Sequence, residues 1–183
     1  MTNPLKSATT RVGRILAAPV RMAKEHRYAD AEAGQQQHKD LPNDRLLPLV
    51  RRFINEGHTV TLAVKGYSMR PFLEHIRDQV TLDAFDELHV GDAVLAEIVP
   101  GHFVLHRIID MTGDGWLTLM GDGNIQGTEH CHINDVCGIV TEYIRPNNHV
   151  TPTSNRWLRW RIRQWRRLLP VRRYLLYIYR LTI

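Results

Sequence analysis

The spacing of hydrophobic residues changes twice along the chain. Between Asn43 and Glu56, apolar residues recur every three or four positions, which predicts an amphipathic helix that Gly57 ends. After Gly57, apolar and polar residues alternate in short segments rich in Val, Ile, Leu and Thr, a pattern typical of β-strands. The strands predicted in this way span residues 59–65, 79–83, 92–99, 102–109, 116–120 and 137–144. From Arg156 the helical spacing returns, and Pro170 divides the tail into two helical segments.

Turn-forming residues separate the predicted strands. Pro100-Gly101 and the glycines at 113 and 115 each stand between two strands and predict hairpins. Six short strands without intervening helices are typical of a mostly antiparallel sheet, coiled or partly closed into a barrel. The expected fold class is therefore mainly β, with an N-terminal helix before the sheet and a basic amphipathic helical segment after it.

The same patterns divide the chain into four parts. Residues 1–42 show no sustained period and are interpreted as a flexible basic and polar segment. Residues 43–145 form the β domain with its leading helix, residues 146–155 read as a linker, and residues 156–183 form the helical tail. With 183 residues, 43% of them hydrophobic, the chain can bury a core without disulfides or metal.

The composition argues against two classes of protein. Two cysteines are too few for a disulfide-built scaffold and favour a reducing compartment. The longest uninterrupted apolar stretch covers residues 174–179, whereas a helix that spans a membrane needs about 20 apolar residues. We therefore expect a cytoplasmic location, peripheral at the membrane if the tail binds one.

The net charge of +5 conceals an uneven distribution. Residues 41–154 carry a net charge of −7, and residues 155–183 carry nine Arg and no acid. Three interpretations of the tail stay open: attachment to a membrane surface, contact with nucleic-acid phosphates, or packing on the acidic body. The membrane surface is favoured because the tail has a wide apolar face, formed by Trp157, Leu158, Ile162, Trp165, Leu168 and Leu169. No nucleic-acid partner is expected, since nothing else in the chain supports one.

Three polar residues stand where they could carry chemistry. Ser68 follows a strand in a turn between Gly66 and Pro71, and is either a turn residue or a nucleophile that needs a neighbouring base. His106 interrupts an apolar strand, and is either a satisfied core histidine or a general base. Asp122 lies in a Gly-Asp-Gly turn, where it either closes the turn or orients an imidazole.

The order and spacing of these residues resemble the signal peptidase and LexA superfamily of serine peptidases. The segment Gly66-Tyr67-Ser68-Met69-Arg70-Pro71 is similar to the superfamily's nucleophile motif, Gly-x-Ser-Met-x-Pro. Residues 105–109 are similar to its general-base box, and residues 121–124 to its Gly-Asp-Asn box. Residues 90–95 and 137–140 are similar to two of its strands, so that the resemblance covers about residues 60–143.

The resemblance implies a serine endopeptidase that cleaves an extended peptide or a precursor protein by acyl transfer. Ser68 would be the nucleophile and His106 the base, as in the histidine-base branch of archaeal and eukaryotic-type signal peptidases. Asp122 would orient the imidazole, with Glu129 as the alternative acid, and the spacing does not decide between them. Position 66 lacks the hydroxyl of many signal peptidases, so the backbone N–H groups of Ser68 and Met69 would bind the oxyanion.

Two other functions stay open. The fold could hold an extended peptide without cutting it, or it could cleave itself at Ala33-Gly34, as LexA-like proteins do. No helix-turn-helix is predicted upstream. The expected partner is a peptide or protein substrate, and no cofactor is expected. A metal site is not expected either, because the residues with metal-ligand chemistry lack a regular spacing: His130, Cys131, His132 and Cys137.

Overall fold

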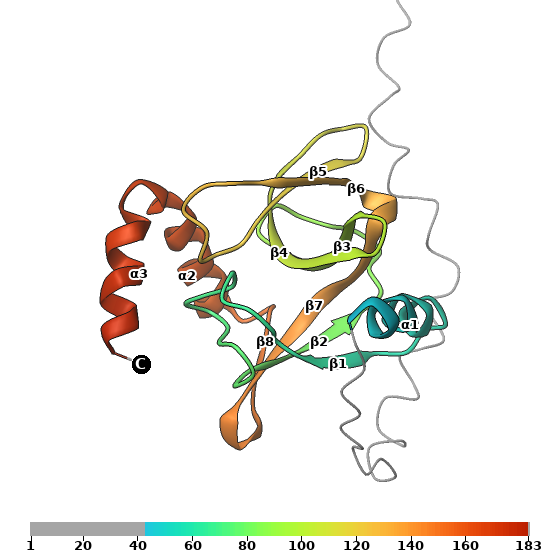
Figure 1. The fold of residues 1–183 in the computed structure, drawn as a ribbon, viewed down its shortest axis with the longest axis horizontal. Coiled ribbons are helices and arrows are strands. Elements are labelled where there is room, and N and C mark those ends of the chain that lie inside the picture. Colours follow the sequence, from blue (N-terminus) through green and yellow to red (C-terminus); the bar gives the residue numbers. More distant parts are fainter. Residues whose placement is uncertain (1–42, 183) are drawn as a thin grey trace, which may run out of the picture.

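The computed structural model describes residues 43–182 (Figure 1). One α-helix precedes a β-sheet, and two α-helices follow it. The helices are α1 (Asn43–Asn55), α2 (Arg156–Arg167) and α3 (Arg172–Leu181), with 3-10 turns η1 (Ile133–Asp135), η2 (Pro146–Asn148) and η3 (Leu169–Val171). The strands are β1 (Val60–Ala63), β2 (Gln79–Asp83), β3 (Ala93–Val99), β4 (His102–Met111), β5 (Trp116–Met120), β6 (Glu129–His132), β7 (Val136–Arg145) and β8 (His149–Pro152).

The eight strands form one antiparallel sheet. Its order is β1-β2-β7-β3-β4-β5-β6, and β8 also pairs with β7. The two ends of this order, β1 and β6, do not pair with each other, so the sheet is not closed. The mainly antiparallel β architecture expected from the alternating segments is therefore confirmed.

Two clusters of buried apolar residues form the core. The larger cluster joins α1, β2, β7 and α2, with Val50, Leu82 and Leu158 among its buried members. The second cluster joins β3, β4 and β5, where Val94 and Ile108 are fully buried. Burial against these clusters stabilises helices whose own propensity would be marginal at this length.

Most of the predicted elements are confirmed. The leading helix and the six expected strands lie within two residues of their predicted bounds, and β2 and β5 match them. The turn at Pro100-Gly101 joins the β3–β4 hairpin, and the glycines at 113 and 115 lie in the turn between β4 and β5.

The prediction of a linker at residues 146–155 is wrong. β8 pairs with β7 from Arg145↔His149 to Glu142↔Pro152, so this segment extends the sheet. β6 was not predicted either. Both strands are polar, and only Cys131 is buried in β6, so the apolar alternation that marks a half-buried strand is missing.

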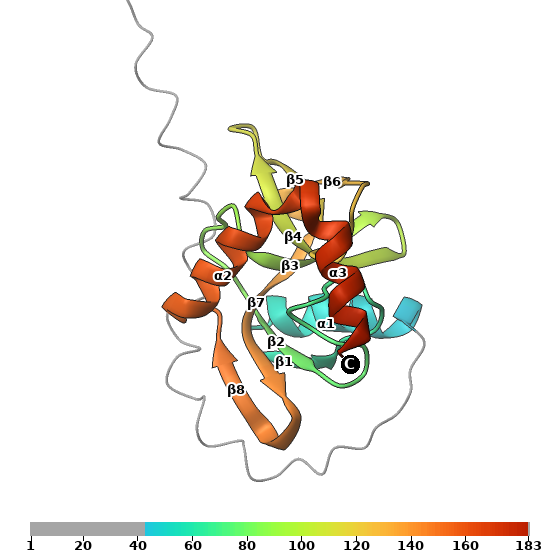
Figure 2. The same cartoon turned by 90° about the vertical axis from the view of Figure 1, so that its left-hand side faces the viewer.

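The helical tail packs on the body, which agrees with one of the three interpretations of its sequence. Leu158 and Ile162 of α2 enter the larger core cluster, and Trp165 packs against it. The predicted apolar face is wider than the buried one, because three of its members are exposed: Trp157, Leu168 and Leu169. Figure 2 shows α2 and α3 as a bent pair in front of the sheet, joined by a short turn.

Two expectations lie outside the described residues. These are the N-terminal segment, residues 1–42, and the self-cleavage site at Ala33-Gly34. Between residues 43 and 182, no helix combines the length and the apolar character that crossing a bilayer requires.

Candidate active site

Ser68 lies in the irregular segment between β1 and β2, residues 64–78, which we call the serine loop. The two ends of the loop are joined, because the Val64 N–H donates to the Asp78 carbonyl at 2.9 Å. Met69 and Leu73 are buried in the larger core cluster. The buried side chain of Met69 anchors the loop, whereas Ser68 itself is only half-buried.

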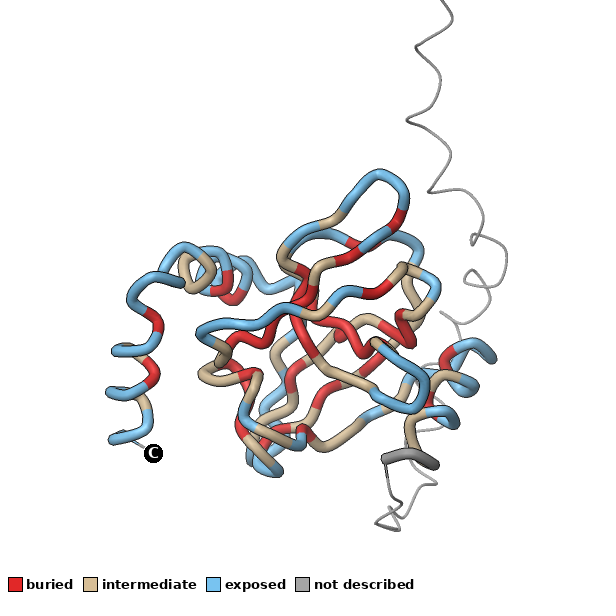
Figure 3. Tube along the Cα trace, turned by 45° about the horizontal axis from the view of Figure 1, so that its top comes forward, coloured by how far each residue is buried: buried red, intermediate tan, exposed pale blue. Residues whose placement is uncertain are grey.

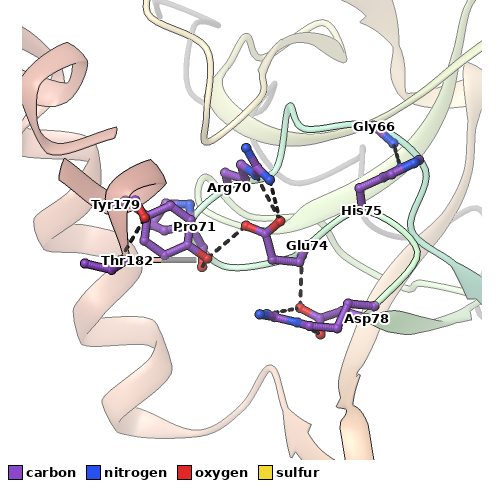
Figure 4. Close-up of polar contacts among 9 residues, drawn as sticks. Gly66, Arg70, Pro71, Glu74, His75, Asp78, Tyr179 and Thr182 are labelled. Carbon is purple, nitrogen blue, oxygen red and sulfur yellow. Dashed lines mark hydrogen bonds and ion pairs between the residues drawn. The ribbon is translucent and has the colours of Figure 1, made fainter. Parts of the chain in front are cut away.

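Gly66 has a conformation that explains why no hydroxyl residue stands at this position. Its φ is +99°, in the left-handed region that L side chains rarely adopt. Its N–H donates to Nδ1 of His75 at 2.8 Å, which fixes the turn two residues before Ser68 (Figure 4). A Ser or Thr at position 66 would strain this turn.

Polar contacts fix the part of the serine loop that follows Ser68 (Figure 4). Arg70 donates two hydrogen bonds to Glu74, at 2.8 and 3.0 Å, and the Glu74 N–H donates to the Asp78 carboxylate at 2.9 Å. The hydroxyl of Tyr179 in α3 donates to the same Glu74 carboxylate at 2.9 Å. The last helix therefore contributes directly to the loop that carries Ser68.

His106 lies in β4 opposite Val94 and is 6% exposed. Its Nδ1 is 2.9 Å from a carboxylate oxygen of Glu129, at the start of β6. With the proton assigned to Nδ1, the imidazole donates to Glu129 and Nε2 keeps a lone pair. Nε2 has no hydrogen-bond partner within residues 43–182, and it is not completely buried. This arrangement suits a general base.

Asp122 does not contact the imidazole, which corrects our first expectation. Its two carboxylate oxygens accept from Arg107 Nε at 2.8 and 3.1 Å, and both side chains are buried. Arg107 also donates to the Gly91 carbonyl and the Tyr143 hydroxyl. Burial alone would lower the pKa of Arg107, but Asp122 and then Tyr143 raise it above its ordinary value. A buried guanidinium needs such a partner, so the Asp122 carboxylate pairs with Arg107. The carboxylate that contacts His106 is that of Glu129.

Ser68 packs against Gly121, the residue that follows β5. Arg107 pairs with Met120, and the same register continued by one residue places Gly121 opposite His106. Residues directly opposite each other in a sheet point to the same face. In this continued register, a Cβ at Gly121 would point to the same face as the His106 side chain. A Cβ at Gly121 would lie 2.9 Å from the Cβ of Ser68 and 2.5 Å from its carbonyl oxygen. Ser68 therefore packs so closely against position 121 that only the hydrogen of a glycine fits there.

The segment after β5 also holds the backbone of Ser68. The Gly123 N–H donates to the Ser68 carbonyl at 2.6 Å. The N–H groups of Ser68 and Met69 donate to no other group of residues 43–182. Ser68 Oγ and the imidazole are not hydrogen-bonded to each other there, and such contacts often tighten only when substrate binds.

An apolar pocket of about 120 Å³ lies beside the serine loop. Its wall combines Val64, at the start of the loop, with Phe103 and Leu105 of β4. β1 is the terminal strand of the sheet order, so one of its edges has no strand partner within the described residues. A peptide paired with this edge would lie alongside the pocket.

The cysteines and histidines of residues 130–137 do not form a metal site. Cys131 is buried in the second core cluster and Cys137 in the larger one. Among residues 43–182 no group of three or more His, Cys, Asp and Glu side chains could hold a metal ion.

Sequence reasoning missed three residues that support the site: Arg107, Glu74 and Tyr179. Arg107 carries a detectable signal, because a charged residue inside an apolar strand needs a buried partner. The contact between Glu74 and Tyr179 joins segments that are 105 residues apart, and no sequence pattern indicates it.

Comparison with known proteins gives no further assignment. No protein-family model, no curated protein and no solved structure matches this chain.

Proposed function

We propose that this chain is a serine endopeptidase of the signal peptidase and LexA type. Ser68 is the nucleophile, His106 the general base and Glu129 the acid that orients the base. The observation that carries the proposal is the contact of His106 Nδ1 with Glu129, which leaves Nε2 without a partner among the described residues; Ser68 packs against Gly121, just after β5, the strand that pairs with the histidine's strand β4. The five sequence segments that resemble the superfamily support the roles of Ser68 and His106.

The reaction follows from these positions. His106 Nε2 takes the proton from Ser68 Oγ, which attacks the carbonyl carbon of the scissile amide. The oxyanion of the tetrahedral intermediate accepts hydrogen bonds from the N–H groups of Ser68 and Met69, a type of contact worth about 3–4 kcal/mol for each donor. The imidazolium then gives its proton to the leaving amine. Water, activated by His106, hydrolyses the acyl-enzyme and releases the second product.

Glu129 acts through His106 rather than on the substrate. Its negative charge stabilises the imidazolium that forms during each transfer, and its contact with Nδ1 holds the tautomer that accepts at Nε2. The buried pair of Arg107 and Asp122 holds β4, which carries His106, to the segment after β5, against which Ser68 packs.

The substrate is an extended peptide with a small apolar side chain near the cut. The free edge of β1 leads into the serine loop, so a peptide paired there runs toward Ser68. The pocket beside the loop has room for one small side chain, at about 120 Å³. Large aromatic residues at this position would be excluded.

The experiment is turnover of a library of extended peptides by the full chain. Wild type and Ser154→Ala should cleave the same peptides, because Ser154 is exposed and lies outside the candidate site. Ser68→Ala should cleave none. Equal cleavage by Ser68→Ala would contradict the proposal.

The alternative of a non-catalytic peptide-binding module predicts a different result in the same assay. Wild type and Ser68→Ala would then bind a peptide equally, and neither would release a product over many hours. That outcome would overturn the catalytic assignment.

A further inference from the structure

The two C-terminal helices carry a strong positive charge with no acid of their own. All nine Arg of residues 155–183 lie in or between α2 and α3. The helices attach to the body through their inner faces. Leu158 and Ile162 of α2 and Leu176 of α3 are buried there, and the Trp165 indole N–H donates to the Asp122 carbonyl at 2.8 Å.

The outer face of α3 is apolar, and no part of residues 43–182 covers it. Four residues spaced at three and four positions occupy it, with exposed fractions between 57% and 70%: Tyr174, Tyr177, Ile178 and Leu181. This spacing puts them on one side of the helix, opposite the buried Arg172 and Leu176. Figure 3 shows that the exposed parts of α3 lie at an extremity of the molecule, away from the sheet.

The turn between α2 and α3 continues this apolar surface. Leu168, Leu169 and Val171 are all exposed. Figure 1 places the turn at the edge of the molecule, on the side away from α1. Apolar side chains clustered at a projecting turn, next to basic helices, are typical of elements that enter a lipid interface.

An arginine-lined pocket of about 320 Å³ lies at the same turn. Leu169 is part of its wall, together with Ile109, Met120 and four arginines: Arg163, Arg166, Arg167 and Arg172. Because Leu169 belongs both to the pocket and to the exposed turn, the basic and apolar surfaces are continuous.

Arg172 is buried, and no carboxylate of the described residues is hydrogen-bonded to it. It is 3% exposed, and its hydrogen bonds go to neutral acceptors, with the Asn124 carbonyl nearest at 2.9 Å. Its Nε has no partner at all within the described residues. Burial lowers the pKa of Arg172, against a smaller opposing effect of Asp122.

Arg166 has the same shortage of negative charge. It donates to the Ile109 carbonyl at 3.1 Å, and burial followed by the charge of Arg107 lowers its pKa. Asp122 is the carboxylate that acts on both arginines, but it is already paired with Arg107. Among the described residues, the guanidinium groups of Arg107, Arg166 and Arg172 thus share the Asp122 carboxylate. This excess of buried positive charge would be stabilised by a bound anion.

We propose that the turn between α2 and α3 docks on an anionic phospholipid bilayer, with a headgroup phosphate in the arginine pocket. The exposed residues of the turn and of the outer face of α3 then lie at the level of the acyl-chain boundary. A bilayer supplies both the missing anion and a cover for the apolar face, whereas a free phosphate supplies only the anion. The surface is independent of peptidase activity, so the two proposals are tested separately.

The test measures sedimentation of the full chain with vesicles. One set contains phosphatidylcholine alone, and the other contains phosphatidylcholine with phosphatidylglycerol. The pocket variant carries Arg163→Gln and Arg167→Gln. The control variant carries Arg52→Gln and Arg156→Gln, which removes the same charge away from the turn. Arg156 is 11 residues before Arg167, about 16 Å along the helix, which exceeds the screening length at physiological salt.

Wild type should bind the phosphatidylglycerol vesicles and not the neutral ones. The pocket variant should lose at least tenfold in binding, since each arginine near a charged bilayer is worth about 1 kcal/mol. The control variant should lose less than threefold. Equal losses in the two variants would overturn the assignment, because they would show a diffuse charge effect.

Two further measurements separate other outcomes. Leu168→Ser with Val171→Ser should weaken vesicle binding without changing the charge, and unchanged binding would count against insertion of the turn. Inorganic phosphate is titrated against the intrinsic fluorescence, because Trp165 lies 5.6 Å from the guanidinium of Arg172. A response to phosphate without any vesicle binding would replace the bilayer by a small phosphorylated ligand.

Discussion

Gly121 is the position where a single methyl group should separate the proposed nucleophile from its base. In Gly121→Ala, the new Cβ would lie 2.5 Å from the Ser68 carbonyl oxygen and 2.9 Å from its Cβ. Reaching the 3.4 Å of ordinary contact requires a shift of about 0.9 Å. The Ser68 carbonyl cannot move freely, because it accepts the hydrogen bond from the Gly123 N–H at 2.6 Å.

The size of the effect follows from that displacement. Forcing a methyl group into a packed contact typically costs about 1–3 kcal/mol of stability. A misplacement of about 1 Å between reacting groups costs about 100-fold in rate. We therefore expect Gly121→Ala to remain folded, with a lower melting temperature, and to react with a serine-directed acylating probe about 100-fold more slowly than wild type.

Gly113→Ala is the matched control. Gly113 lies in the turn between β4 and β5, its φ is outside the left-handed region, and a Cβ there would meet nothing within 4 Å. Its melting temperature and its rate with the probe should equal those of wild type. If Gly121→Ala reacts within twofold of this control, the inferred role of the packing between Ser68 and Gly121 is refuted.

Three other changes test the contacts around the site. Tyr179→Phe removes the hydroxyl that donates to Glu74 at 2.9 Å, so urea unfolding should show a loss of about 1 kcal/mol and the probe should react more slowly. Asp122→Asn leaves the buried Arg107 guanidinium without its carboxylate, and the loss of about 3–5 kcal/mol should appear as a large drop in melting temperature. Burial raises the pKa of Cys131 to about 11. The folded protein keeps this thiol protonated where the unfolded chain ionises near pH 9, so the free energy of unfolding should fall as pH rises from about 9 to 11.

Each of these three predictions has a control variant in which the predicted effect should be absent or reduced. Tyr177→Phe alters an exposed tyrosine of the same helix and should leave the reaction with the probe unchanged. Glu56→Gln breaks an exposed ion pair with Arg52 and should not shift the melting temperature measurably. Cys131→Ala should flatten the loss of stability at high pH. A drop that persists unchanged in this variant would assign the effect to other groups.

Much of the fold could be predicted from the sequence because most strands are rich in Val, Ile, Leu and Thr. β2 alternates between buried and half-buried residues, whereas β4 and β7 each contain three successive buried residues and are recognised by their content of Val, Ile and other apolar residues. β6 and β8 lack this signal, since pairing of their backbones rather than burial of their side chains places them in the sheet. The apolar residues of the tail recur at helical spacing. This spacing predicted the helix, and it also brings Leu158 and Ile162 to the buried face of α2.

The candidate site could be predicted only in part, because contacts between strands decide which groups meet. Ser68 and His106 stand out in the sequence as polar residues in a turn and in an apolar strand. The choice between Asp122 and Glu129 depends on the β4–β5–β6 register and on the demand of Arg107 for a carboxylate. Neither factor has a local signature, so the sequence alone left both acids open.

Covalent labelling at Ser68 tests the central claim most directly. The full chain is treated with a fluorophosphonate, and the modified residue is located by mass spectrometry of its peptides. The account predicts one adduct, on Ser68, that forms at least about 100-fold more slowly in His106→Gln and in Glu129→Gln. An adduct on another serine, or labelling of Ser68 at the same rate in all three proteins, would contradict it.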